Sequence, residues 1–124
     1  MENVEYNDEL KTNFLFLSFK KLQKEGIDEG KMVDLKNAYL EEIAKAVFGY
    51  PRGILAYEKR PGEIHISARG NNLSNKINLP QVMADLGGNG GGHLNACGAT
   101  VVGGMEEVKE KLLLSIKKYL GQTS

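Results

Sequence analysis

The hydrophobic pattern in the first third of the chain favours a buried helix over residues 7–24. Phe14 and Leu17 lie on one helical stripe, and neighbouring apolar residues leave little of the middle of the segment polar. A helix that is apolar nearly all round is buried on several sides. A strand over residues 14–19 is the alternative, which the charged residues after it make less favourable. Residues 1–6 are polar enough to fray.

Three later segments have clearer helical patterns. Residues 33–48 and 106–120 repeat apolar residues every three or four positions, with charged residues between them. Residues 80–86 form a short helix that begins with proline and is followed by glycine, as helix termini favour. The apolar stripes consist of Tyr39, Leu40, Ile43, Ala44 and Val47 in the first helix and Val108, Leu112, Ile116 and Leu120 in the last.

The segments between these predicted helices have the residue patterns of β-strands. Residues 53–57 and 63–68 are β-prone and are joined through Pro61-Gly62, a pair that favours a turn, so we expect a hairpin. Residues 99–102 are a further strand. The order of the elements predicts an α/β or α+β fold: a small mixed β-sheet flanked by helices, in a single domain over residues 7–124.

Composition and charge narrow the function classes. The 124 residues include sixteen basic and sixteen acidic side chains, so no bulk positive field is available to hold long nucleic acid. Cys97 is the single cysteine and cannot form an internal disulfide, which suits a reducing compartment. No signal peptide is visible, and the longest apolar run, residues 14–17, is too short to span a bilayer. We expect a cytoplasmic protein without a membrane segment.

A glycine-rich stretch dominates residues 86–102. Five glycines lie between Gly87 and Gly92, and His93 follows directly. Successive N–H groups in a glycine loop can converge on an anion, and the histidine adds a donor beside them. The simpler interpretation is a flexible connection. However, the run lacks the serine, proline and charged residues of a disordered linker and leads into a strand, so we expect a phosphate-binding loop.

These residues resemble a known family signature. The segment Gly90-Gly91-Gly92-His93-Leu94-Asn95-Ala96-Cys97-Gly98 is similar to the G-G-G-H-x-x-A-A-G signature of the C-terminal, DHH-associated domain of DHH-family phosphoesterases. That family includes RecJ-type exonucleases and oligoribonucleases. The one departure is Cys97, where the family usually has alanine. The resemblance is good over residues 53–102 and poor over the first third of the chain.

The resemblance implies a substrate-recognition domain that binds a nucleotide or a short single-stranded oligonucleotide. Arg69 ends a strand in which polar His65, Ser67 and Arg69 share one face; the family commonly has an arginine there that faces the ligand. His65 is simply a solvent-exposed side chain in our interpretation. The expected phosphate-binding residues are Arg69, Gly90, Gly91, Gly92, His93 and, as a weaker candidate that could equally cap a turn, Asn95.

The catalytic part of such enzymes is not expected in this chain. The resemblance places two metal ions, Mn²⁺ or Mg²⁺, in a separate N-terminal DHH domain, where aspartates and histidines hold them. Here no aspartate is adjacent to a histidine, and His65 and His93 are 28 residues apart. We therefore expect no catalytic residue, metal site or cofactor in this chain, which would need a DHH catalytic domain as its partner.

Two other functions remain open. The chain could be a free-standing oligonucleotide-binding or regulatory module, which would bind short oligonucleotides by itself. It could instead be an oligomerisation module whose glycines allow close packing and bind nothing. Whichever function holds, residues 14–22 suggest a homodimer, because six of these nine residues are Phe or Leu. In an intact enzyme the same surface could instead face the catalytic domain or its linker.

Overall fold

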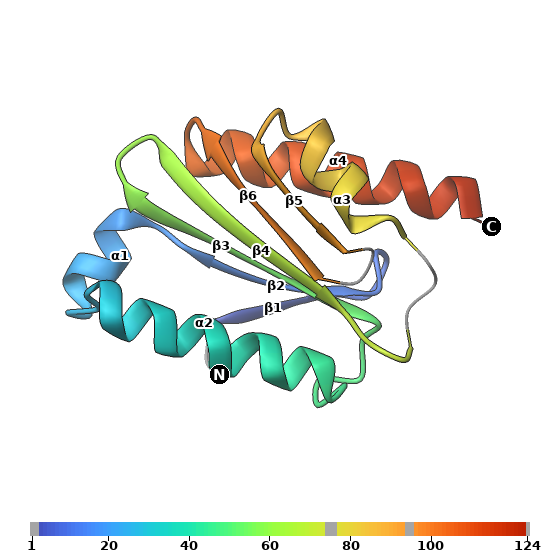
Figure 1. Cartoon of the computed structure of the whole chain (residues 1–124), viewed down its shortest axis with the longest axis horizontal. Helices are drawn as coiled ribbons and strands as arrows, with labels where there is room; N and C mark the ends of the chain where they lie inside the picture. Colours follow the sequence, from blue (N-terminus) through green and yellow to red (C-terminus); the bar gives the residue numbers. More distant parts are fainter. Residues whose placement is uncertain (1–2, 74–76, 94–95, 124) are drawn as a thin grey trace.

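A six-stranded mixed sheet organises the chain, in a computed structural model that describes residues 3–73, 77–93 and 96–123. The strand order is β1-β2-β3-β4-β6-β5; β2 and β3 are parallel, and the other neighbouring pairs are antiparallel (Figure 1). This confirms the predicted small mixed sheet flanked by helices. The elements are β1 (Val4–Asn7), β2 (Thr12–Leu17), α1 (Phe19–Lys24), α2 (Glu29–Ala44), β3 (Arg52–Arg60), β4 (Glu63–Gly70), α3 (Leu79–Asp85), β5 (Asn89–His93), β6 (Ala96–Val102) and α4 (Met105–Thr123).

The predicted helix over residues 7–24 is wrong. The segment forms β2 and the short helix α1, and β1 pairs with β2 in a region expected to fray. Strand β2 lies inside the sheet with helices over both faces, so its apolar run is continuous and lacks a period of two. Ser18 separates the two elements, because its hydroxyl accepts a hydrogen bond from the Lys21 N–H and begins the helix.

The apolar surface expected at residues 14–22 is also wrong. Phe14, Leu15 and Leu17 are at most 2% exposed, and Leu22 is 6% exposed. These four side chains pack within the chain, and of the six Phe and Leu residues of the segment only Phe16 and Phe19 are half-buried. The core accounts for most of the apolar content of this segment, and a homodimer stays a prediction.

The remaining predicted helices and the hairpin are confirmed, with shifted ends. Helix α2 begins at Glu29 because the Asp28 carboxylate accepts a hydrogen bond from the Lys31 N–H. It ends before the predicted boundary, because the backbone of Ala46 turns into the left-handed region with a φ of 56°. Strands β3 and β4 pair antiparallel, as their Pro-Gly turn predicts.

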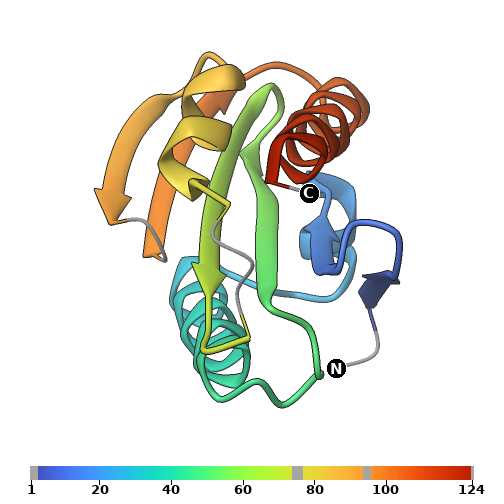
Figure 2. The same ribbon diagram turned by 90° about the vertical axis from the view of Figure 1, so that its right-hand side faces the viewer.

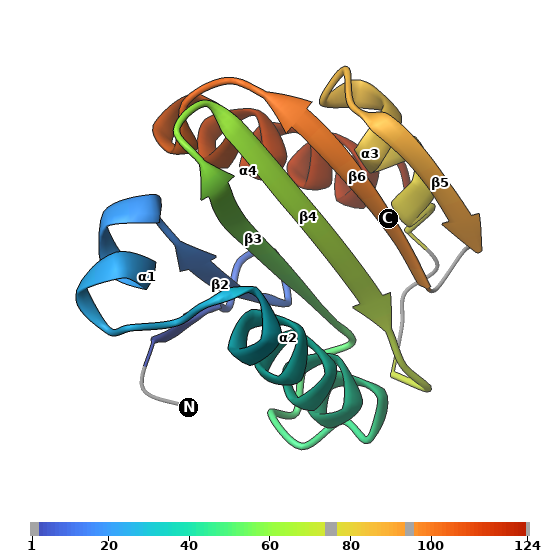
Figure 3. The ribbon, with the colours of Figure 1, turned by 60° about the vertical axis from the view of Figure 1, so that its left-hand side comes forward.

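The two faces of the sheet are covered to different extents. Helices α3 and α4 pack on one face over the larger core, and α2 packs on the other (Figure 2). Helix α1 lies on the same side as α2 (Figure 3). The second pair covers β1, β2 and β3 and reaches only to β4, so β6 and β5 are open on that side (Figure 3). The larger core includes Ile54, Ile66, Val82, Val101 and Leu112, and the smaller one Leu15, Leu17, Met32, Tyr39 and Ile43.

Candidate functional site

The glycine segment forms a strand, so the predicted loop is wrong. Residues Asn89–His93 make β5, which pairs antiparallel with β6 at the edge of the sheet. Neighbouring N–H groups of a strand point alternately toward the partner strand and toward the open edge. The N–H groups of Gly91 and Gly92 therefore do not converge as in a loop nest, although an edge strand leaves alternate N–H groups unpaired.

Some glycines of the segment are required by packing. Gly92 has a φ of 141°, and a Cβ there would lie 2.5 Å from the Ala96 carbonyl oxygen. A Cβ on Gly88 would lie 2.8 Å from a methyl group of Val101. Gly90 pairs with Ala99, in the row that faces α3. Gly88 and Gly92 therefore need to be glycine for close contact or backbone geometry, whatever the strand binds.

Arg69 and His93 lie in one row across the open face. Ala96 on β6 pairs with Arg69 on β4 and also with His93 on β5. Directly paired residues direct their side chains to the same face, and two strand spacings separate the outer Cα atoms by about 10 Å. Both outer side chains are exposed, and neither has a hydrogen-bond or ion-pair partner among the described residues. Among the described residues, Ala96 is the one that separates Arg69 from His93 in this row.

The next row along the strands has almost no side chains. Ser67 on β4 pairs with Gly98 on β6, which pairs with Gly91 on β5. A Cβ on Gly98 would lie 3.0 Å from the Ile66 carbonyl oxygen, so the space directly above the backbone is open only because this residue is glycine. The open face thus has a shallow floor of main chain, bordered by Arg69 and His93.

A polar pocket of about 220 Å³ lies beside this floor, where α2 passes over the sheet. Lys36 of α2 is half-buried and lines it from above; Ser67, Gly98 and Thr100 line it from the sheet. Tyr57 closes the side toward β3. Lys36 was not expected from the sequence, because a helical pattern does not show which part of the sheet the helix covers.

His65 has a local structural partner at the edge of this pocket. Its Nε2 lies 2.9 Å from Oε2 of Glu63, and its ring lies 5.3 Å from the ring of Tyr57. The hydrogen bond with His65 is the main reason why the pKa of Glu63 is lowered. His65 is therefore half-buried and engaged, rather than simply solvent-exposed as expected.

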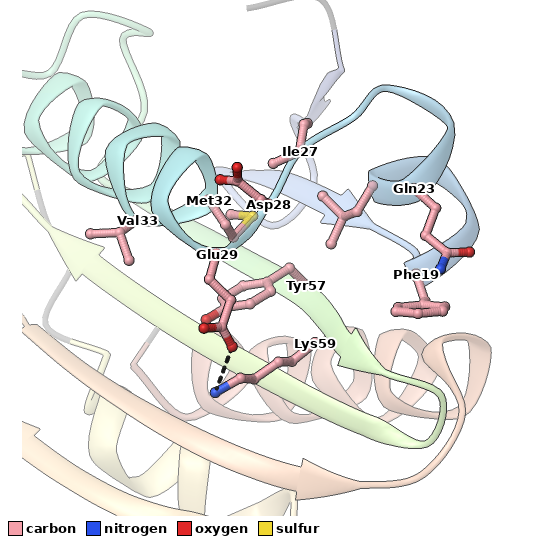
Figure 4. A pocket seen from close by; sticks show the side chains of 10 residues that line it. Phe19, Gln23, Ile27, Asp28, Glu29, Met32, Val33, Tyr57 and Lys59 are labelled. Atoms are coloured by element: carbon pink, nitrogen blue, oxygen red, sulfur yellow. Dashed lines mark ion pairs between the residues drawn. The ribbon is translucent and has the colours of Figure 1, made fainter.

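A second pocket of about 220 Å³ lies on the other side of Tyr57, between α1 and the start of α2 (Figure 4). Glu29 and Lys59 form an ion pair of 3.5 Å at its opening, and the Tyr57 ring lies beneath them. Its polar lining consists of Gln23, Asp28, Glu29 and Lys59. Its apolar lining consists of Phe19, Leu22, Ile27, Met32, Val33 and Tyr57.

The other predicted features are placed as follows. Within residues 3–73, 77–93 and 96–123, no three His, Cys, Asp or Glu side chains come together as a metal site. Asn95 lies outside the described residues. Cys97 is half-buried, and burial raises the pKa of its thiol to about 11. No helix in the described part of the chain has the length and apolar content needed to cross a bilayer.

Solved structures share this fold at low sequence identity. An exopolyphosphatase-related protein from Bacteroides fragilis superposes with a TM-score of 0.75 and 22% identity over 98% of the chain. The pGpG-specific phosphodiesterase PggH from Vibrio cholerae superposes with a TM-score of 0.59 and 15% sequence identity over 97% of the chain. The chain spans 33% and 36% of the lengths of these two proteins. The C-Ala domain of Aquifex aeolicus alanyl-tRNA synthetase superposes with a TM-score of 0.57 and 12% sequence identity. This match covers 86% of the chain and 90% of that domain.

The sequence also matches a family model. A search among curated proteins found no significant match. The model of the DHHA1 domain matches residues 14–122. This range includes most of the first third of the chain, where the resemblance was poor, together with the open face and the glycine strand. The chain therefore belongs to the DHHA1 domain family, the domain associated with DHH phosphoesterases.

Proposed function

We propose that the chain is the substrate-binding domain of a DHH-type phosphoesterase and holds a phosphate of its substrate on the open face. The ligand is a nucleotide or a short single-stranded oligonucleotide. The single observation that carries the proposal is the row in which Arg69 and His93 flank Ala96. Family membership supports the same role, since DHHA1 domains occur with DHH catalytic domains.

The chemistry of the row suits a phosphate. The guanidinium of Arg69 offers two parallel N–H donors to two phosphate oxygens. The imidazole of His93 donates from the opposite side, and β5 supplies N–H groups at its open edge. Asn95, outside the described residues, is a further candidate contact. With only half a cleft around it, the phosphate stays exposed to water, so we expect a Kd of order millimolar for the isolated chain.

The hydrolytic reaction belongs to a partner domain in this proposal. A DHH catalytic domain with Mn²⁺ or Mg²⁺ would supply the two-metal clamp on the attacking and leaving oxygens. The residues of this chain bind and orient the substrate, and the open face of β4, β6 and β5 becomes one wall of the cleft between the domains. A cytoplasmic location is part of the same proposal.

Titration of the labelled chain with a nucleoside monophosphate, followed by amide chemical shifts, tests the site. We expect the amides of residues 90–93 and of Arg69 to move together, and Arg69→Ala or His93→Ala to abolish the response. Arg60→Ala is the matched control, because Arg60 is an exposed arginine on the β3–β4 hairpin, away from the row.

The titration also separates the alternatives. Shifts confined to another face of the sheet would refute the proposed site. Micromolar binding of oligonucleotides by the chain alone would favour a free-standing binding module, because half a cleft does not reach that affinity. An oligomerisation module would show no nucleotide-induced shifts at all.

A further inference from the structure

We propose that the pocket between α1 and α2 binds a free apolar amino acid whose side chain has the size of leucine, methionine or phenylalanine. The side chain of this ligand enters the apolar part of the pocket, and its α-carboxylate and α-ammonium groups pair with Lys59 and Glu29 at the opening (Figure 4). Tyr57 of this pocket pairs with His65, which is four residues, about 13 Å, from Arg69 along β4. The site is therefore separate from the phosphate row, and the inference does not rest on the proposed function.

Hydrogen bonds within the chain hold the two helices apart. The N–H of Phe19, the first residue of α1, donates to Oε1 of Glu58 on β3 at 2.9 Å. The connection that follows α1 is fixed by the Ile27 N–H, which donates to the Leu22 carbonyl oxygen at 2.9 Å. The Asp28 carboxylate then caps the start of α2. Both walls of the pocket are thus fastened, and the space between them is present before a ligand binds.

The interior of the pocket suits one apolar side chain. Leu22 and Met32 are its most buried lining residues, and Phe19 and Tyr57 add half-buried aromatic rings from α1 and β3. A cavity of roughly 150 Å³ with apolar walls holds a benzene molecule, and this pocket has a volume of about 220 Å³. A branched aliphatic or single-ring side chain therefore fits, and its burial removes apolar surface from water.

The charges at the opening match an amino acid better than a singly charged ligand. Glu29 and Lys59 lie 3.5 Å apart, and their side chains are 82% and 32% exposed. Such an exposed ion pair contributes little to stability, so a ligand can open it at small cost. An amino acid has both complementary charges on the carbon atom that bears its side chain. A ligand with a single charge would meet a like charge beside its partner.

Chemical-shift titration of the full chain with L-leucine tests the inference. We expect the amides of residues 19–33 and 57–59 to move, and those of Arg69 and residues 90–93 to stay in place. N-acetyl-leucine lacks the ammonium group and leucinamide lacks the carboxylate. Each should bind roughly tenfold more weakly than leucine, as for the loss of one charge-assisted hydrogen bond.

Variants of the ion pair test the same contacts from the side of the protein. Lys59→Gln and Glu29→Gln should each weaken leucine binding roughly tenfold. Lys45→Gln and Glu41→Gln are the matched controls, because Lys45 and Glu41 form an exposed ion pair of 3.0 Å at the other end of α2. Each control changes the net charge as its counterpart does and should leave the affinity for leucine unchanged. Circular dichroism verifies that all four variants keep the fold.

Three outcomes would overturn the inference. The first is the absence of leucine-induced shifts around the pocket. The second is equal binding of leucine and the uncharged N-acetyl-leucinamide, which would assign the pocket to an apolar side chain of a polypeptide. The third is an unchanged affinity for leucine in Lys59→Gln or Glu29→Gln. None of these outcomes affects the proposed function, which is tested by the nucleotide response of Arg69 and His93.

Discussion

At the scale of single residues, Arg52 is the most unusual side chain in the described chain. It is 1% exposed, and burial lowers its pKa to about 10. Its Nη1 donates to the carbonyl oxygens of Leu10, at 2.9 Å, and Lys11, at 3.3 Å, and lies 3.2 Å from the Thr12 hydroxyl. Nη2 is buried without a partner among the described residues. Arg52 therefore fastens the turn between β1 and β2 to the start of β3.

Replacing Arg52 should destabilise the fold. In Arg52→Met, the carbonyl groups of Leu10 and Lys11 lose a charged donor, so we expect a loss of roughly 2–4 kcal/mol in the free energy of unfolding. Urea denaturation measures it. Arg60→Met should cost nearly nothing, because Arg60 is mostly exposed. Equal stability of the two variants would show that the hydrogen bonds of Nη1 make no net contribution to the free energy of unfolding.

The sequence reveals such residues unevenly. Alternation along 63–68 predicted that Arg69 lies on the outer face, because the period of a strand is two. The pairing of Ala96 with both Arg69 and His93 depends on register, which one strand pattern does not contain. Arg52 and Lys36 gave no signal, because the burial of one and the position of the other over the sheet depend on distant segments.

At the scale of elements, α2, α3, α4, the β3–β4 hairpin and β6 were predictable, and the two ends of the sheet were not. Amphipathic helices carry a period that records their exposed side. Strand β2 is buried on both faces, so its apolar run lacks a period and resembles a buried helix. Three of the five residues of strand β5 are glycine, which has low strand propensity, so its conformation comes from pairing with β6.

Gly92→Ala tests whether the backbone of β5 positions His93. The φ of 141° at this position is unfavourable for alanine, and the new Cβ would lie 2.5 Å from the Ala96 carbonyl oxygen. The end of β5 must therefore move away from β6. We expect the amide chemical-shift changes caused by the nucleotide to become as small as in His93→Ala. The amide signals of the rest of the chain should stay unchanged. Gly104→Ala is the control, since a Cβ there meets nothing within 4 Å. Unchanged nucleotide binding in Gly92→Ala would mean that His93 does not depend on this backbone geometry.

At the scale of the whole molecule, the uneven cover of the sheet matters most for function. Helices cover one face, while on the other α2 stops short of β6 and β5. The sequence predicted helices around a mixed sheet but not the strand order, so it could not indicate which strands are left open. With equal numbers of acidic and basic residues, attraction of a phosphate must come from the local row rather than from net charge.

The isolated chain should not hydrolyse phosphoesters. A two-metal centre needs several carboxylates and imidazoles in one place, and the described residues bring no three such groups together. Asp85 illustrates this: its Oδ2 accepts hydrogen bonds from Ser115 and Tyr119 on α4. Product analysis with Mn²⁺ or Mg²⁺, on a dinucleotide, a nucleoside bisphosphate and single-stranded DNA, should give the rate of a protein-free blank. Metal-dependent turnover that survives repurification would require a catalytic centre in this chain and would remove the need for a partner domain.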